Sequence, residues 1–455
     1  MSPPNILLVM ADDHRADAIG ALGHPVVSTP HLDDLVRRGT TLTRISTAGG
    51  LMAAVCSPSR ASLLTGLFPF RADAAPRLIR NPPYEVRIPS LARTLPQHFR
   101  CAGYETFFTG KWHNDLPALL RSFEGGRQIF HGGMCDHERV PVRDLEEIRR
   151  GAPEHAGPGF STDLFCGAAE EFIRSRTRDR PFLAWVALTS PHDPRTPPAA
   201  YRRMYDSASI PLPPNFQTEH AFDNGELAIR DECLIERPLS PDQVRSHLAD
   251  YYGMISHHDA AIGRLLRALT ESGQDANTLV VYLSDHGLAL GSHGLLGKQN
   301  VYEHSVRVPL ILAGPGVPEG ARHDGLGYAF DLYATLCELS GVPVPRGLDS
   351  RSLVPGWASG ATAVRSTLGA AYMAGQRMVT DGRWKLVVYR VEKAERIQLF
   401  DLVYDPHECH NLAADPQQAK RIQHLWGQLR AWQTDAGDRW LRETQPAGDL
   451  SELTA

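Results

Sequence analysis

The sequence lacks the long hydrophobic runs, the basic excess and the paired cysteines that mark three broad classes of protein. No segment contains about 18 uninterrupted apolar residues, so a membrane-spanning helix is not expected. The net charge of -5 leaves no electrostatic footprint for nucleic acid or for a membrane surface. The seven cysteines are odd in number and include no C-x-x-C pair, which argues against a disulfide framework. An anionic substrate would therefore have to be attracted locally.

The start of the chain also lacks the features of an export signal. Residues 1–5 lead directly into the apolar run Ile6–Met10, without a basic segment or a long apolar stretch before a cleavage site. We therefore expect a cytoplasmic protein whose cysteines are reduced thiols. Six cysteines are expected to be packing residues. They are Cys101, Cys135, Cys166, Cys233, Cys337 and Cys409.

Short apolar runs that end in polar side chains are the main structural signal of this 455-residue chain. The four runs are Ile6–Met10 before Asp12-Asp13-His14, Tyr104–Phe108 before Gly110-Lys111-Trp112-His113, Phe182–Leu188 before Ser190-Pro191-His192-Asp193, and Leu279–Leu283 before Asp285-His286-Gly287. Helical stretches are expected at residues 31–38, 163–176, 241–272 and 331–339. This alternation predicts an α/β fold, with a doubly wound, mostly parallel sheet flanked by helices. The polar groups would then gather at the carboxyl edge of the sheet.

The composition changes near residue 355, and we expect a domain boundary there. Residues 1–355 would form the α/β domain, and residues 356–455 a small α+β subdomain. In the latter, strands are expected at residues 377–380, 384–391 and 398–402, and an amphipathic helix at residues 416–436. Two proline-rich segments, residues 76–96 and 191–214, are expected to be functional loops over the sheet edge.

The stretch Cys56–Gly66, with the sequence CSPSRASLLTG, predicts the start of a helix. Ser57 would be the N-cap, Pro58 the first helical residue, and Leu63 and Leu64 would face a core. The N-terminus of such a helix offers unpaired N–H groups to an anion such as sulfate. A structural and a chemical function of this stretch are therefore compatible.

Six motifs in this order resemble the formylglycine-dependent sulfatases of the alkaline phosphatase superfamily, including bacterial and iduronate-type glycan sulfatases. The motifs are the Asp12-Asp13 pair, the Cys56 stretch, Gly110-Lys111-Trp112-His113, Ser190-Pro191-His192, Ser284-Asp285-His286-Gly287 and Gly297-Lys298. The resemblance implies that a formylglycine-generating enzyme oxidises Cys56 to an aldehyde. The aldehyde hydrate has two hydroxyls: one attacks sulfur, and deprotonation of the other expels sulfate by C–O cleavage.

A divalent cation site is the second expectation. Adjacent carboxylates such as Asp12 and Asp13 suit a hard cation, although an isolated pair would more simply be a solvated turn. The resemblance implies that Asp12, Asp13, Asp285 and His286 bind Ca²⁺ together with the modified Cys56. Imidazole is a poor ligand for calcium, so His286 leaves Mg²⁺ or Mn²⁺ open.

The remaining catalytic residues are assigned by the same resemblance. Arg60, one helical turn after Cys56, would favour the ionised hydroxyl of the modified residue. Lys111 would contact that residue and the sulfate, and His113 would take the proton whose loss expels sulfate. His192 and Lys298 would bind the sulfate and protonate the leaving oxygen.

Several further polar residues are weaker candidates. His257, His258 and Asp259 are expected to serve helix packing and surface polarity rather than catalysis. Six others are candidates for the lining of the substrate pocket. These are His14, Asp136, His137, Arg195, Glu303 and His304.

These observations predict a hydrolase that cleaves a sulfate monoester, of a mono- or oligosaccharide, to an alcohol and inorganic sulfate. A phosphonate monoester or phosphodiester hydrolase is the alternative, because such relatives resemble sulfatases. A binding protein with an inactive site ranks far below, since every motif position is filled. Trp112 argues against choline sulfate, because choline sulfatases usually have methionine there. An oligomer is left open.

Overall fold

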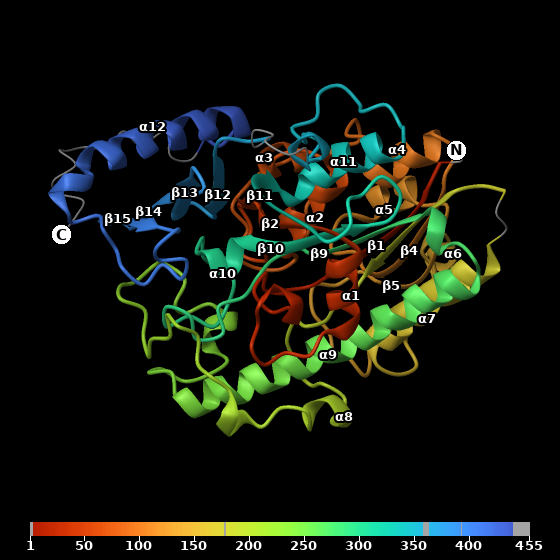
Figure 1. Cartoon of the computed structure of the whole chain (residues 1–455), viewed down its shortest axis with the longest axis horizontal. Coiled ribbons are helices and arrows are strands. Elements are labelled where there is room, and N and C mark those ends of the chain that lie inside the picture. The colour runs from red at the N-terminus through yellow and green to blue at the C-terminus, as the bar shows by residue number, and fades with distance from the viewer. Residues whose placement is uncertain (1–2, 177–178, 358–363, 393, 440–455) are drawn as a thin grey trace.

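The computed structural model describes residues 3–176, 179–357, 364–392 and 394–439, and its centre is a sheet of eight strands (Figure 1). The spatial order is β11 (Ala321–Tyr328), β2 (Gly39–Ser46), β10 (Arg307–Ala313), β9 (Thr278–Ser284), β1 (Asn5–Ala11), β8 (Phe182–Ala187), β4 (Glu105–Lys111) and β5 (Gly125–Phe130). Only β10 is antiparallel to its neighbours, so the predicted mostly parallel sheet is confirmed.

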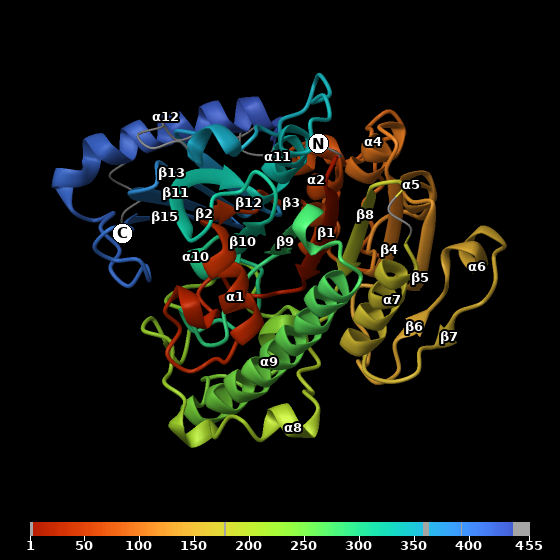
Figure 2. The same cartoon turned by 45° about the vertical axis from the view of Figure 1, so that its right-hand side comes forward.

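Helices cover both faces of this sheet. One face packs against α1 (Pro30–Arg38), α7 (Ser161–Ser175) and α9 (Pro241–Glu271), and the other against α2 (Cys56–Thr65), α4 (Leu95–Cys101), α5 (Leu116–Ser122) and α11 (Leu332–Leu339) (Figure 2). Successive side chains of a strand point to opposite faces. Thus Ile6 and Leu8 belong to one core cluster and Leu7 to the other. None of the described helices is long and apolar enough to span a membrane.

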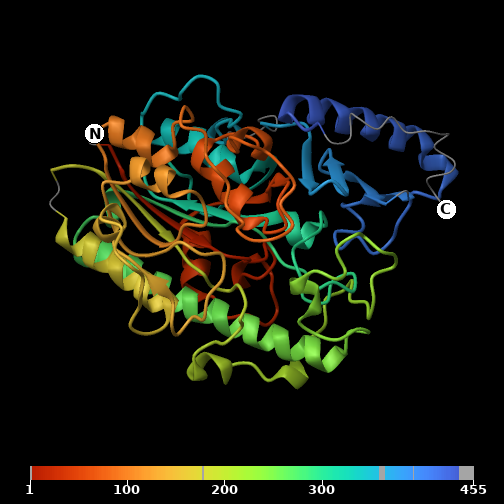
Figure 3. The same cartoon turned by 180° about the vertical axis from the view of Figure 1, so that it is seen from behind.

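A second sheet lies at one end of the first, beneath α12 (Ala419–Ala436) (Figure 3). Its order is β15 (Ala394–Asp401), β14 (Trp384–Val391), β13 (Gln376–Thr380), β12 (Leu368–Tyr372) and β3 (Gly49–Gly50). The predicted small antiparallel sheet is therefore present, but β12 and β3 were not predicted. Only glycine fits at Gly49, where φ is 72° and an added Cβ would lie 1.8 Å from the Ala371 carbonyl oxygen.

The shorter elements complete the chain. They are α3 (Pro69–Ala72), β6 (Pro141–Val142), α6 (Leu145–Arg149), β7 (His155–Ala156), α8 (Ala199–Arg202) and α10 (Glu303–Val306).

Two local predictions were wrong. Ser57 is not the N-cap of α2, because the helix begins at Cys56 and Pro58 lies within its first turn. Proline is tolerated throughout that turn, since none of its N–H groups has an intrahelical partner. Leu63 and Leu64 are buried in the core as predicted. Of the six cysteines expected to be packing residues, Cys101, Cys233 and Cys409 are exposed.

Candidate active site

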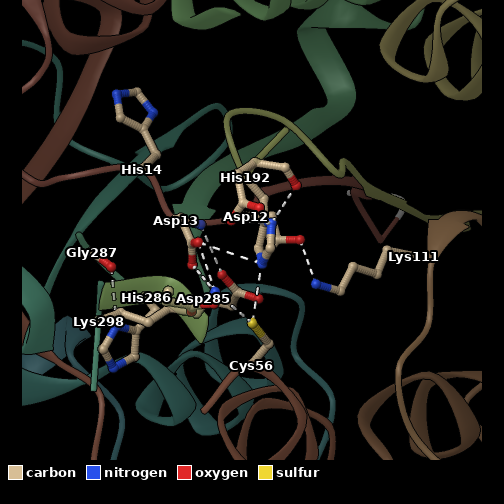
Figure 4. A network of polar contacts seen from close by, with 12 residues as sticks. Asp12, Asp13, His14, Cys56, Lys111, His192, Asp285, His286, Gly287 and Lys298 are labelled. Atoms are coloured by element: carbon tan, nitrogen blue, oxygen red, sulfur yellow. Dashed lines mark hydrogen bonds and ion pairs between the residues drawn. The ribbon is translucent and has the colours of Figure 1, made fainter. Parts of the chain in front are cut away.

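Four parallel strands deliver polar side chains to one place at the carboxyl edge of the sheet (Figure 4). Asp12 and Asp13 follow β1, Asp285 follows β9, Lys111 ends β4 and His192 follows β8. The ends of adjacent parallel strands meet at one edge, so residues far apart in the sequence become neighbours. The structure thus brings together residues from four of the predicted motifs.

Three carboxylates, of Asp12, Asp13 and Asp285, form the centre of this group. One oxygen of each lies within 4.8 Å of the others, and all three side chains are buried. Asp13 has a φ of 71°, a strained value for a non-glycine residue, and its N–H donates to Asp285 Oδ1 at 3.2 Å. Burial raises the pKa of Asp13 to about 7 against the pull of Lys298, and burial and Asp12 raise that of Asp285 to about 6.

These carboxylates fit a hard divalent cation. Their oxygens are the donors that Ca²⁺ and Mg²⁺ prefer, and one oxygen of each lies within 4.8 Å of the others. The raised pKa values of Asp13 and Asp285 show that burial disfavours two of the charges, which a bound cation would offset.

Three cationic side chains surround the carboxylates. Lys111 Nζ lies 2.5 Å from Asp12 Oδ2, Lys298 Nζ lies 2.6 Å from both Asp13 oxygens, and Arg60 Nε donates to Asp285 Oδ2 at 2.8 Å. Burial alone would raise the pKa of Asp12, but Lys111 and Arg60 together hold it well below its usual range. The cations therefore keep part of the anionic cluster ionised in a buried setting.

Cys56 lies at the N-terminus of α2, facing this cluster (Figure 4). Its Sγ is 3.1 Å from Lys298 Nζ and 3.5 Å from Asp12 Oδ1. Burial raises the pKa of the thiol to about 12, although Lys111 and Lys298 oppose the shift. The encoded thiol is therefore protonated at neutral pH and is a poor nucleophile as it stands.

The two histidines of the predicted site lie beside the cluster and line the same pocket as Cys56. His192 Nε2 is 3.7 Å from Asp13 Oδ2, and its Nδ1 lies 2.7 Å from the Asp193 carbonyl oxygen. His113 has a φ of 58°, and its buried Nδ1 has no hydrogen-bond partner among the described residues. Burial, together with Lys298 for His192 and Lys111 for His113, lowers the pKa of both rings, which favours their neutral forms.

His286 lies apart from the three carboxylates in this structure, and its role as a metal ligand stays a prediction. Neither group of potential metal ligands in the described part of the chain contains it, and its Nδ1 lies 3.1 Å from the Gly287 carbonyl oxygen. Its ring points away from the carboxylates in Figure 4. Adjacent residues after a strand leave in different directions, so Asp285 faces the other two carboxylates while the ring of His286 lies to one side.

A pocket of about 430 Å³ opens from the cluster. Besides Cys56, His113, His192 and Lys298, its lining includes polar and large residues that were not predicted. These are Tyr84, Glu85, His131, Met134, Ile229, Arg230, Asp231 and Gln299. Tyr84 and Glu85 belong to the proline-rich loop 76–96. A functional role was predicted for this loop, but no individual residue in it was named. Gln299 directly follows the Gly297-Lys298 motif, and the others come from segments without a motif.

The weaker candidates lie outside this pocket lining. Glu303 and His304 line other cavities, and His14 Nε2 contacts the Ala18 carbonyl oxygen. His137 acts indirectly, with Nε2 3.0 Å from the His192 carbonyl oxygen. Asp136 and Arg195 are likewise absent from the lining.

The mid-helix trio of α9 is buried, so its predicted contribution to surface polarity was wrong, while the predicted packing role is confirmed. Asp259 accepts hydrogen bonds from the N–H groups of His31 and Leu32 in the first turn of α1, at 3.1 and 2.8 Å. His257 and His258 are also buried.

Glu232 holds the loop that carries Lys298. Its two carboxylate oxygens accept hydrogen bonds from the N–H groups of Gly297 and Leu296, each at 2.8 Å, and Arg237 Nη2 donates to it at 2.8 Å. Glu232 is only 2 % exposed. The carboxylate therefore fixes the backbone immediately before Lys298.

Replacing Glu232 with alanine should destabilise the fold and slow turnover. Two buried N–H groups would lose their acceptor, which is expected to lower the free energy of unfolding by about 2–4 kcal/mol. A displacement of Lys298 is expected to lower kcat at least about tenfold in protein that remains folded. Denaturant unfolding and steady-state kinetics measure the two effects. Glu236→Ala, at an exposed neighbouring position, is the matched control, and equal behaviour of both variants would contradict the assignment.

Comparisons with known proteins agree with this geometry. The sulfatase family model matches residues 4–342, and a model described as N-sulphoglucosamine sulphohydrolase, C-terminal, matches residues 291–435. The chain is 28% identical over 462 residues to an ulvan-active sulfatase of Formosa agariphila, covering 96% of this chain and 82% of the relative. It is also 28% identical over 515 residues to the multifunctional alkaline phosphatase superfamily protein PehA of Trinickia caryophylli, covering 97% of each.

Solved structures show the same fold. A protein solved in complex with its substrate D-glucosamine-2-N,6-O-disulfate superposes with a TM-score of 0.81 at 22% identity, covering 96% of this chain and 99% of that protein. The family model spans well over half of the sequence, and the site residues converge as described. The chain belongs to the sulfatase family.

Proposed function

We propose that this protein hydrolyses a sulfate monoester to an alcohol and inorganic sulfate, with Cys56 oxidised to formylglycine and a divalent cation, most simply Ca²⁺, beside it. The observation that carries the proposal is the position of Cys56. Its Sγ lies 3.1 Å from Lys298 Nζ and faces the three carboxylates, yet burial keeps the thiol protonated. An unmodified thiol has no nucleophilic role in such a setting, whereas a converted residue does.

The modified Cys56 and the cation would each supply defined chemistry. The aldehyde hydrate of formylglycine supplies one hydroxyl that attacks sulfur and a second whose deprotonation allows sulfate to leave by C–O cleavage. A divalent cation held by Asp12, Asp13 and Asp285 would favour negative charge on the oxygens around it.

The side chains of the chain bind and orient the sulfate. Lys111 and Lys298 place ammonium groups beside Cys56, and Arg60 fixes Asp285 through Nε and the Lys111 carbonyl oxygen through Nη1, at 2.8 and 2.6 Å. These fixed charges act in a buried site, where preorganised electrostatic stabilisation is most effective.

Proton transfers fall to neutral His113 as the acceptor and to the ammonium of Lys298, beside His192, as the donor. We assign to His113 the acceptance of the proton from the second hydroxyl, since its Nδ1 is unpaired among the described residues and its ring lines the pocket. His192, with Lys298, is assigned to the sulfate and the leaving oxygen, because both line the pocket and flank Asp13. Proton transfer by a positioned group typically contributes about 10²- to 10⁴-fold.

A sulfated sugar is the proposed substrate. One relative is named for its activity on ulvan, and the structural neighbour was solved with a sulfated glucosamine. A pocket of about 430 Å³ lies within the range of small-ligand sites, about 300–1,000 Å³.

The alternative function is hydrolysis of phosphonate monoesters or phosphodiesters, which the similarity to a multifunctional superfamily member keeps open. The test is kcat/KM for 4-nitrophenyl sulfate against 4-nitrophenyl phenylphosphonate, with the same leaving group. We expect the sulfate ester to be preferred. A clear preference for the phosphonate would overturn the proposal in favour of the alternative.

Other expectations stay predictions with their own tests. The domain division at residue 355 is tested by limited proteolysis, the cytoplasmic location by cell fractionation, and the oligomeric state by light scattering. Maturation by a formylglycine-generating enzyme is tested by coexpression.

A further inference from the structure

The pocket has two parts that differ in exposure and charge. Its floor contains Cys56, His113, His192 and Lys298, all buried, and lies against the cationic groups of the site. We call the more exposed part the mouth, formed by Tyr84, Glu85, His131, Met134, Arg230 and Asp231. There the side chains of Glu85 and Arg230 are 37% and 47% exposed. The floor would take the sulfate, so the mouth contacts the alcohol portion.

The one arginine in the mouth already has anionic partners. Arg230 Nη1 lies 2.9 Å from Asp231 Oδ1, and its Nη2 forms an ion pair with the buried Asp193. Asp231 in turn accepts a hydrogen bond from Gln299 Nε2 at 2.7 Å. The guanidinium is therefore neutralised by two carboxylates that are themselves fixed.

The other basic group of the mouth is also matched. His131 Nε2 lies 3.6 Å from Glu85 Oε2 and 2.9 Å from the Asn114 carbonyl oxygen. Even with His131 protonated, the two cations of the mouth are matched by its two carboxylates, Glu85 and Asp231, and Arg230 also pairs with Asp193 outside the mouth. Nearby Arg80 is itself paired with Glu226 at 2.9 Å. Among the described residues of the mouth, no surplus cation is present to bind a second anionic group.

Beside the donors of Arg230, His131 and Tyr84, the mouth presents the carboxylate oxygens of Glu85 and Asp231 as hydrogen-bond acceptors. Carboxylates accept but do not donate, so Glu85 and Asp231 match hydroxyl or amino groups of a ligand. Tyr84, Met134 and Ile229 add apolar surface for the carbon face of a ring. A carboxylate or second sulfate on the same ring would approach these acidic side chains without a compensating cation.

We propose, on the basis of the proposed function, that the pocket selects sulfate esters by the charge of the ring that enters it. The selected ring carries the reacting sulfate as its only anion and otherwise offers hydroxyl or amino groups. Glu85 and Asp231 are the specificity-determining residues. Like-charge repulsion at the mouth excludes uronate rings and doubly sulfated rings.

Three phenyl sulfates with meta-hydroxymethyl, meta-aminomethyl and meta-carboxymethyl groups test this selection, because they differ mainly in the charge presented to the mouth. We expect kcat/KM for the carboxymethyl ester to be about tenfold below that of the hydroxymethyl ester. The aminomethyl ester should equal or exceed the hydroxymethyl ester. The differences should shrink at about 0.5 M salt, because exposed charges are screened.

A single-residue variant localises the effect. Glu85→Gln should reduce the penalty on the carboxymethyl ester about threefold, whereas Glu154→Gln, which removes the same charge at an exposed position outside the pocket lining, should leave it unchanged. Equal or better turnover of the carboxymethyl ester by the unaltered protein would overturn the inference and leave the sulfatase assignment standing. If protein with a modified Cys56 cleaved none of the three esters, the proposed function would fail as well.

Discussion

Cys56→Ala is expected to lower kcat on 4-nitrophenyl sulfate by about 10⁴- to 10⁶-fold, the range seen when a covalent nucleophile is removed. Alanine cannot be converted to an aldehyde, so no hydroxyl remains to attack sulfur. The binding groups Lys111, Lys298 and His192 stay in place, so the variant should still bind a sulfate ester. Its KM or inhibition constant should therefore change far less than kcat.

Mass spectrometry of the wild-type protein supplies the direct chemical check. The tryptic peptide from Ile45 to Arg60 should carry an aldehyde or its hydrate in place of the thiol of Cys56. Cys101→Ala, which removes an exposed thiol elsewhere, should retain full activity. Active enzyme that kept only the thiol, combined with an unaffected Cys56→Ala variant, would refute the mechanism.

Removal of the divalent cation is expected to lower kcat by about 10²- to 10⁴-fold, because a bound ion contributes several kcal/mol of charge stabilisation. The three carboxylates that would hold it are buried and close together. A neutral water molecule in place of the ion would not offset the repulsion between them. Dialysis against a chelator, followed by addition of Ca²⁺, Mg²⁺ or Mn²⁺, measures the effect and identifies the ion that restores activity.

A ligand variant separates loss of the ion from general damage. Asp285→Asn should weaken ion affinity, measured by titration calorimetry or by the ion concentration needed for half-maximal activity, while Asp275→Asn at an exposed position should not. Full activity after exhaustive chelation, with no ion detected by elemental analysis, would contradict the metal site.

Much of the site was predictable because each motif follows a strand that the sequence marks clearly. Asp12 and Asp13 come directly after an apolar run, and so does Asp285, so their meeting at one sheet edge follows from a parallel sheet. The position of His286 was less predictable, because a motif specifies which residues follow a strand but not the direction in which each side chain leaves the turn.

Other parts of the fold had no readable signal. The strand Gly49–Gly50 has no side chains and hence no hydrophobic pattern, and only its pairing with β12 defines it. Glu232 resembles any charged residue in a loop until the backbone N–H groups of Gly297 and Leu296 are placed against it.

The chemistry of the floor can be read from the chain alone: which strands end in carboxylates, lysines and histidines, and which cysteine lies at the start of a helix. Local patterns suffice for this, since strand and helix periodicity depend on neighbouring residues. The charge balance of the mouth, in contrast, depends on how the chain folds. The pairing of Arg230 with Asp193 and Asp231, and of His131 with Glu85, joins segments that no local pattern connects. Because Coulomb interactions depend on distance in space and not along the chain, a ring's compatibility with that mouth becomes visible only when the chain is folded.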